Sequence, residues 1–178
     1  MKILAIIAAV LVIAVGLVLA YATTKPDAFR VERAVTINAA PEKIFPLIND
    51  FRAWRDWSPY EDRDPDLKRT YSQPASGKGA VYSWDGNSNI GAGRMEILDA
   101  PAPSKVTIKL DFFRPFEASS TAEFAMTPSG NGTRVTWAMV GPNAYFGKVM
   151  SVFMDMDKMV GGDFEVGLQK LKTRAEGS

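Results

Sequence analysis

The sequence predicts one apolar N-terminal helix followed by an α+β domain, and three observations support this prediction. Residues 3–22 form an unbroken run of 20 uncharged, apolar or small residues. From residue 29 onward, apolar and polar residues alternate in short segments separated by turn residues, which is typical of antiparallel strands. Near the C-terminus the large apolar residues instead recur every three or four positions, as they do on one face of a helix.

The N-terminal run has the length of a membrane span. At about 1.5 Å per residue it would form a helix roughly 30 Å long, which matches the bilayer core. We predict an anchor over residues 1–24 that packs on nothing in the domain, a linker over 25–28 and the domain over 29–178. The chain would then be a single-pass membrane protein with its domain outside the cytoplasm. The alternative is a signal peptide cleaved after Ala20-Tyr21-Ala22, which would leave a secreted or periplasmic domain.

The segment from residue 29 to residue 59 predicts one strand and two short helices. Residues 29–37 alternate with the period of a half-buried strand. Pro41, after a cap at Asn38 or Ala40, suits the first turn of a helix that ends near Asn49, and Pro46 should distort that helix. In the second helix Trp54 and Trp57 share a face. We expect one of them to fix the helix to the sheet through an indole hydrogen bond, and a gate over a pocket is the alternative.

The remainder of the chain predicts six more strands and a covering helix. Turn residues divide the region after Leu67 into a meander of alternating segments. The pair Gly161-Gly162 interrupts the C-terminal helix, with a cost of roughly 2 kcal/mol relative to two alanines, so we expect a kink or a break there. The helix should cover the sheet with the stripe Phe153, Met156, Val160, Phe164, Leu168 and Leu171.

Composition excludes several classes of function. The chain has no histidine and no cysteine, which removes imidazole and thiolate catalysis and the usual zinc sites. Its 21 basic and 20 acidic residues are nearly balanced and form no basic stretch for nucleic acid. Its glycine pairs lack the spacing of a phosphate-binding loop. We therefore predict no metal, no cofactor and no nucleic-acid partner, and the sequence leaves the oligomeric state open.

Four segments carry a family resemblance. They are residues 31–45, residues 49–59 with their Trp-x-x-Trp-Ser-Pro ending, residues 82–87 and residues 91–97. Together with the order of elements over residues 29–176, they resemble the helix-grip fold of the SRPBCC superfamily, which includes START domains and the polyketide cyclase/dehydrase family. The resemblance implies a curved seven-stranded antiparallel sheet wrapped around the long C-terminal helix. It also implies a cavity between the two that takes up lipids, sterols, polyketides or other apolar molecules.

Strand alternation identifies the side chains that would face such a cavity. Most are aromatic or methionine, so the wall would be apolar and adaptable, although the same residues could simply fill the core. Arg33 lies on an inward phase and could meet a polar ligand head, unless it reaches solvent as strand-end arginines do. The predicted lining comprises Arg33, Trp54, Trp57, Tyr82, Trp84, Met95, Ile97, Leu110, Phe112, Phe124, Met126, Trp137, Met139, Phe153 and Met156.

The function predicted from the sequence is reversible binding of a hydrophobic small molecule, lipid or polyketide-like, close to the membrane. Such a site usually needs a cavity of about 300 Å³ or more. One alternative is a cyclase- or hydrolase-like enzyme in which Arg33, Tyr82 and a bound water act on the ligand. The other is an envelope interaction module with a filled core. The carboxylates Glu96 and Glu123 fall on the outer face of the strands, so the sequence shows no paired acid and base.

Overall fold

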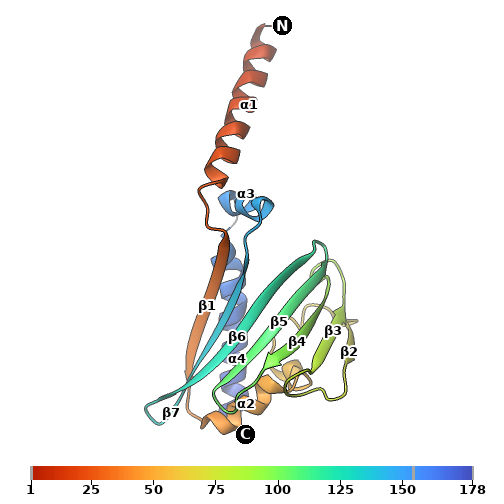
Figure 1. The fold of residues 1–178 in the computed structure, drawn as a ribbon, viewed down its shortest axis with the longest axis vertical. Coiled ribbons are helices and arrows are strands. Elements are labelled where there is room, and N and C mark those ends of the chain that lie inside the picture. The colour runs from red at the N-terminus through yellow and green to blue at the C-terminus, as the bar shows by residue number, and fades with distance from the viewer. Residues whose placement is uncertain (1, 154, 178) are drawn as a thin grey trace.

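A computed structural model describes residues 2–153 and 155–177, without the side chain of Met156. Its elements follow the predicted order (Figure 1). They are α1 (Lys2–Ala22), β1 (Ala28–Ile37), α2 (Pro41–Asn49), the 3-10 helix η1 (Ala53–Asp56), β2 (Lys68–Tyr71), β3 (Val81–Asp85), β4 (Ala92–Asp99), β5 (Lys105–Arg114), β6 (Ala118–Ser129), β7 (Gly132–Pro142), α3 (Tyr145–Phe153) and α4 (Met156–Glu176).

The strands form one antiparallel sheet of seven strands, in the order β1-β7-β6-β5-β4-β3-β2. Figure 1 shows the sheet curving around α4, with α2 at the end of the sheet near the C-terminus. The predicted α+β fold, its meander and its covering helix are therefore confirmed. The alternating residues of the strands place their apolar side chains on the concave face, because successive side chains point to opposite faces.

The core lies between this concave face, α2, η1 and the C-terminal part of α4. Phe164, Leu168 and Leu171 of α4 are almost fully buried, as the predicted stripe requires. Phe164 stacks on Trp137 of β7, with ring centroids 4.0 Å apart and planes inclined by 10°. Ile44 and Ile48 of α2 are also fully buried and belong to the same cluster. The sheet and the two helices thus share one continuous core.

Both short helices form, and both tryptophans of the second one are fixed in the core. Ala40 is the N-cap of α2 and Pro41 its first residue, and the helix continues through Pro46 to Asn49. The Trp54 indole N–H donates to the carbonyl oxygen of Ile48 at 2.9 Å, and that of Trp57 donates to Leu47 at 2.8 Å. Both indole rings are buried against the sheet, so neither tryptophan forms a gate over a pocket.

The C-terminal helical stripe breaks at a different place from the one predicted. The Gly161-Gly162 pair lies inside α4, which runs without interruption, so the prediction of a break there is wrong. The helix that carries Phe153 is instead a separate one, α3, and α4 starts afresh with Asp155 as its N-cap. A Cβ on Gly161 would lie 2.1 Å from the Arg33 guanidinium, so this glycine makes room for a side chain packed across the helix.

The apolar helix α1 extends away from the domain, but not without contact. It is the one helix among residues 2–153 and 155–177 that is long and apolar enough to span a membrane. Its large side chains are exposed around the whole helix. At its C-terminal end, however, Ala22 is buried, and the Tyr145 hydroxyl of α3 donates to the Leu19 carbonyl oxygen at 3.1 Å. The prediction that the helix packs on nothing is therefore wrong for its last turn.

Two glycines of α4 provide a direct test of this packing. Alanine at Gly162 meets nothing within 4 Å, so Gly162→Ala should raise the free energy of unfolding by about 1 kcal/mol through helix propensity. Alanine at Gly167 would put its Cβ 2.9 Å from both Trp137 and Pro59. Because overpacking costs about 1–3 kcal/mol, Gly167→Ala should lower the free energy of unfolding. Denaturant titration of the full chain in detergent measures both, and equal stabilisation by the two variants would contradict the packing described.

Candidate ligand cavity

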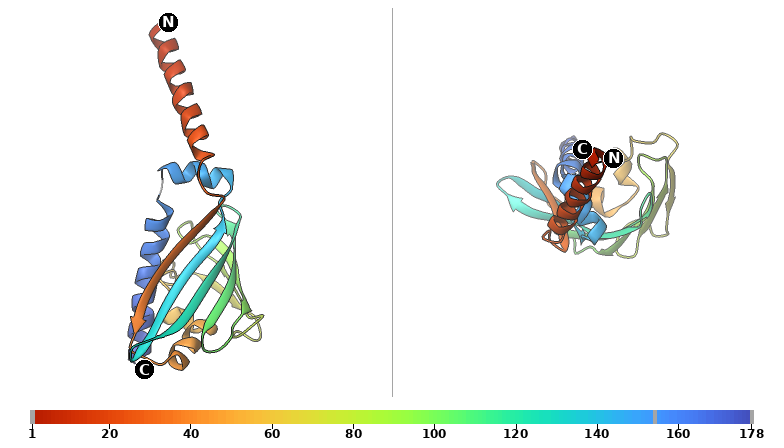
Figure 2. Two further views of the ribbon diagram at one scale, coloured as in Figure 1. Left: turned by 60° about the vertical axis from the view of Figure 1, so that its left-hand side comes forward. Right: turned by 90° about the horizontal axis from the view of Figure 1, so that it is seen from above.

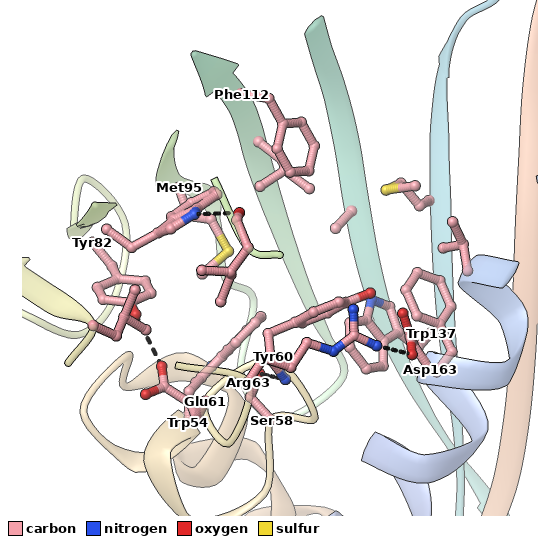
Figure 3. A pocket seen from close by; sticks show the side chains of 18 of the residues that line it. Trp54, Ser58, Tyr60, Glu61, Arg63, Tyr82, Met95, Phe112, Trp137 and Asp163 are labelled. Atoms are coloured by element: carbon pink, nitrogen blue, oxygen red, sulfur yellow. Dashed lines mark hydrogen bonds and ion pairs between the residues drawn. The ribbon is translucent and has the colours of Figure 1, made fainter. Parts of the chain in front are cut away.

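A cavity of about 260 Å³ lies between the concave face of the sheet and the N-terminal half of α4 (Figure 3). It is slightly smaller than the lower bound expected from the sequence. Its wall combines η1 and the loop that follows it, the strands β3 to β7, and α4. The lining residues are Trp54, Ser58, Tyr60, Glu61, Arg63, Leu67, Tyr82, Trp84, Asn89, Ile90, Met95, Leu110, Phe112, Ala122, Trp137, Met139, Val160, Asp163 and Phe164.

Many of the side chains predicted from strand alternation meet in this wall. They come from elements far apart in the sequence, and the aromatic rings contact one another: Trp84 and Phe112, for example, pack edge to face with centroids 5.8 Å apart. The predicted residues in the wall are Trp54, Tyr82, Trp84, Met95, Leu110, Phe112, Trp137 and Met139. Aromatic and thioether side chains make this part of the cavity apolar.

A second group of predicted residues is inward-facing but lies behind the wall. Trp57 and Phe124 are fully buried in the core, with their rings edge to face and centroids 5.9 Å apart. Met126 and Ile97 are also buried and do not reach the cavity. These four side chains support the wall through packing. For the three strand residues, period-2 alternation identifies the face of the sheet but not the position along it.

The remaining predicted residues lie elsewhere. Phe153 is 70% exposed on α3, since the helical stripe does not continue from α3 into α4. The side chain of Met156 lies outside the described part of the structure. Arg33 points inward from β1, as its phase predicted, but it meets α4 and not the cavity.

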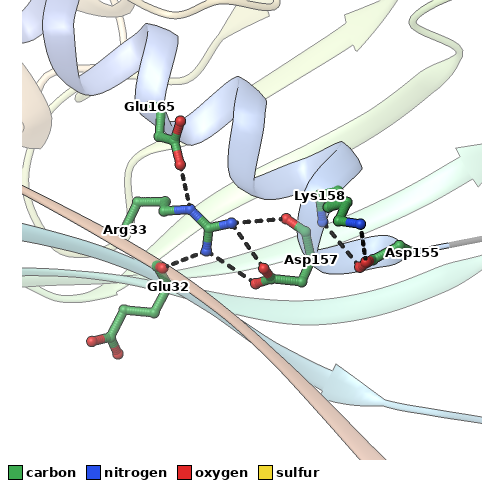
Figure 4. Close-up of polar contacts among 6 residues, drawn as sticks. All are labelled: Glu32, Arg33, Asp155, Asp157, Lys158 and Glu165. Atoms are coloured by element: carbon green, nitrogen blue, oxygen red, sulfur yellow. Dashed lines mark hydrogen bonds and ion pairs between the residues drawn. The ribbon is translucent and has the colours of Figure 1, made fainter.

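The contacts of Arg33 form a compact ionic cluster between β1 and α4 (Figure 4). Its guanidinium donates to the Asp157 carboxylate at 2.8 and 3.0 Å and to the Glu165 carboxylate at 2.7 Å. It also donates to the backbone carbonyl oxygens of Asp157 and Glu32. The hydrogen bonds to Asp157 and then to Glu165 raise the pKa of Arg33. The bonds to Asp157 and Glu165 tie β1 to α4, so Arg33 here is a structural residue.

Trp84 reaches the cavity because its neighbour on β4 is a glycine. Trp84 pairs with Gly93, and a Cβ at Gly93 would lie 2.4 Å from the indole ring. The ring therefore lies flat across the glycine, where any larger residue would displace it. The indole N–H of Trp84 donates to the carbonyl oxygen of Ile90 at 3.3 Å, which fixes the β3–β4 loop at the edge of the cavity.

The cavity also has a polar side, which the sequence analysis missed. Glu61, in the loop after η1, has a side chain only 7% exposed. It accepts a hydrogen bond from the Tyr82 hydroxyl at 2.9 Å and from the Arg69 guanidinium at 2.6 Å. Burial, followed by the neighbouring Glu61 carboxylate, raises the pKa of Tyr82, so this phenol stays protonated. Glu61 lies in a segment with no periodic pattern, and nothing in the sequence indicated its position.

A second polar cluster lies where α4 meets the same loop. Arg63 forms an ion pair with Asp163 of α4 and lies over the ring of Tyr60, 5.0 Å from its centroid. Burial, followed by the Asp163 charge, raises the pKa of Tyr60. Arg63 and Asn89 are exposed lining residues, and they mark the mouth of the cavity. Within residues 2–153 and 155–177 there is no group of three acidic residues placed to hold a metal ion.

The family of the chain follows from a comparison with known proteins. Residues 28–176 match the model of the family described as polyketide cyclase / dehydrase and lipid transport. The chain therefore belongs to this family. A comparison with curated proteins gives no match.

Similar solved structures share the fold at low sequence identity. A Chromobacterium violaceum protein is 13% identical, with a TM-score of 0.58 over 85% of this chain and 99% of that chain. The Aha1 dimer from Colwellia psychrerythraea is 17% identical, with a TM-score of 0.56 over 83% and 96%. The di-domain ARO/CYC protein StfQ from the steffimycin biosynthetic pathway is 11% identical, with a TM-score of 0.61 over 84% and 51%. This chain thus spans about half of StfQ.

Two stacked tyrosines test the polar side of the cavity. Tyr71 and Tyr82 have ring centroids 5.1 Å apart, but the buried Tyr71 hydroxyl has no partner in the described structure. Tyr82→Phe removes a hydrogen bond to a carboxylate and should lower the free energy of unfolding by about 1.5–3 kcal/mol. Tyr71→Phe removes an unpaired buried hydroxyl and should leave stability unchanged or higher. Chemical denaturation compares the two, and equal losses would contradict the Tyr82–Glu61 bond.

Proposed function

We propose that this chain is a single-pass, membrane-tethered protein whose domain binds a hydrophobic small molecule in the cavity between the sheet and α4. One observation carries the proposal: the core is closely packed around Trp137 and Phe164, yet beside them about 260 Å³ remains unfilled. Protein interiors are otherwise packed with few voids larger than a water molecule. We infer that this apolar cavity takes a compact ligand, smaller than those that occupy sites of about 300 Å³ or more.

The chemistry of the wall supports an uncharged or weakly polar ligand. The aromatic and methionine side chains provide apolar contact, while the charged groups at the rim are already paired. Arg63 pairs with Asp163, and Arg69 pairs with Glu61. A charged ligand buried here would lose its hydration without gaining an unpaired charged partner, which is unfavourable. A small lipid or an aromatic polyketide-like molecule suits both the apolar part and the polar part of the wall.

The N-terminal helix supports the tether. It has the length and the apolar composition of a membrane span, and it projects from the end of the domain. This helix is apolar on all sides, and its contacts with the domain lie in its last turn. Outside a membrane, most of its apolar surface would be exposed to water. We therefore infer that it remains in the bilayer. A signal sequence would have the same composition, and detection of a mature protein beginning near Thr23 would establish that alternative.

A cyclase-like enzyme is a second candidate, and the polar side of the cavity favours it. Two carboxylates, Glu61 and Asp163, and two phenols, Tyr60 and Tyr82, lie in the wall, and each pair could hold or move a proton. The relative StfQ is an ARO/CYC protein. Arg33 takes no part in such chemistry, because it lies outside the cavity. Turnover of an aromatic polyketide-like ligand, lost in Glu61→Gln but with binding retained, would favour the enzyme.

The binding proposal predicts ligand-induced stabilisation. In nanodiscs at neutral pH, the full chain should melt at a higher temperature in the presence of 1-dodecanol or 1,8-dihydroxyanthraquinone, two uncharged ligands, as measured by tryptophan fluorescence. A ligand present at 100 times its Kd would add about 2.7 kcal/mol to the free energy of unfolding, or roughly 5–10 °C.

Two variants of lining residues provide the controls. Ala122→Leu adds a branched apolar group to the cavity, so it should abolish the shift while keeping the domain folded. Met139→Leu conserves volume and should preserve the shift, at a stability cost below about 1.5 kcal/mol. If neither ligand class shifts the melting curve of the unmodified chain, the binding proposal fails, and the interaction-module alternative takes its place.

A further inference from the structure

Helix α3 has an apolar face that the domain does not cover. Phe146 is 61% exposed, Met150 37% and Phe153 70%, and their spacing of four and three residues places them on one side of the helix. Tyr145, 49% exposed, borders the same side. We call Tyr145, Phe146, Met150 and Phe153 the α3 face. No residue of α3 is acidic, and none is fully buried.

The opposite side of α3 is tied to the chain that leaves α1. Lys148 points away from the α3 face and forms an ion pair with Asp27, just before β1, and its side chain is only 12% exposed. From the border of the α3 face, the Tyr145 hydroxyl donates a hydrogen bond to the carbonyl oxygen of Leu19 in the last turn of α1. Figure 2 shows α3 lying across the end of α1, between that helix and the sheet. The domain thus holds α3 at the level where α1 ends.

The exposed apolar surface extends beyond α3 onto the β5–β6 turn. Phe116 is 70% exposed, and the centroid of its ring lies 5.9 Å from the ring centroid of Phe146. Phe113, at the end of β5, is 54% exposed. Monomeric soluble proteins rarely leave large side chains of this kind side by side in water. Two separate segments therefore contribute to one surface, next to a candidate membrane span.

We propose that the α3 face, together with Phe113 and Phe116, lies in the headgroup region of the bilayer that α1 spans. This inference rests on the proposed tether. Continuity with α1 identifies the bilayer as the occupant, because the end of a spanning helix fixes the level of the interface, and α3 is hydrogen-bonded to that end. A helix with one apolar face, no acidic residue and a lysine on its other side suits an interfacial position. Aromatic side chains are also enriched at that depth.

The consequence concerns the orientation of the cavity. Phe113 follows Phe112 on β5, and Phe112 belongs to the cavity wall. Phe113 is 54% exposed whereas Phe112 faces the cavity, so the end of β5 carries both part of the lipid-contacting surface and part of the cavity wall. Contact with the bilayer would hold the domain in one orientation, instead of leaving it free to rotate on its tether.

Site-directed spin labelling of the full chain tests this proposal, because the chain has no cysteine of its own. Single nitroxide labels at Phe116→Cys and Phe153→Cys are placed in nanodiscs of phosphatidylcholine and phosphatidylglycerol. Collision rates with oxygen and with a water-soluble nickel complex then report depth. The ratio of oxygen to nickel collisions should be several-fold higher at both positions than at Val166→Cys, a matched apolar position on α4 that is 51% exposed.

A fourth label separates failure of this inference from failure of the tether. Leu11→Cys lies in the middle of α1 and should report the bilayer core. If it does so while residues 116 and 153 match residue 166, α1 spans the membrane and the α3 face does not contact lipid. If residue 11 also reports water, the tether itself is wrong. Spin–spin broadening confined to residues 116 and 153 would show that a second copy covers this surface, and would overturn the proposal.

Discussion

The contact between Trp137 and Phe164 determines how closely α4 approaches the sheet. The two rings stack at van der Waals distance, and the ring of Phe124 also stacks on Trp137, with centroids 4.9 Å apart. Gly167, one turn further along α4, leaves space for the edge of Trp137. Toward the C-terminal end of α4, Leu168, Leu171 and Ala175 are buried in the core. Toward its N-terminal end the sheet curves away, and the cavity is what remains.

A second constraint holds the N-terminal half of α4, where the helix faces the cavity. Arg33 reaches across from β1 and bonds Asp157 and Glu165, two residues eight positions apart on α4. These carboxylates are more than half exposed, so solvent screening limits what the ion pairs add to stability. Their value is geometric, because a guanidinium that spans two turns of a helix fixes its rotation. Gly161 makes this possible, which explains a glycine that propensity alone disfavours in a helix.

Periodicity predicted the parts of this fold that depend on which face a residue occupies. Alternation placed Met95, Phe112 and Met139 correctly on the concave face, and the helical stripe placed Leu168 against the sheet. Periodicity failed for Phe153, because the hydrophobic spacing in the sequence continues past the point where α3 ends and α4 begins. A helix end depends on local capping, here by Asp155, and not on hydrophobic spacing. The same limit applies to Gly161. The side chain that requires a glycine there is Arg33, which lies on β1 and not on α4.

The polar side of the cavity depends entirely on tertiary structure. Glu61 and Arg63 lie in an irregular loop, and only the fold brings them to Tyr82 and Asp163. Each carboxylate in the wall meets a guanidinium, so the wall presents compensated charge beside an apolar surface. In the proposed binding role, a neutral ligand would leave these pairs intact, whereas an ionic ligand would have to break one of them to find a charged partner. The paired rim thus favours uncharged molecules independently of the shape of the cavity.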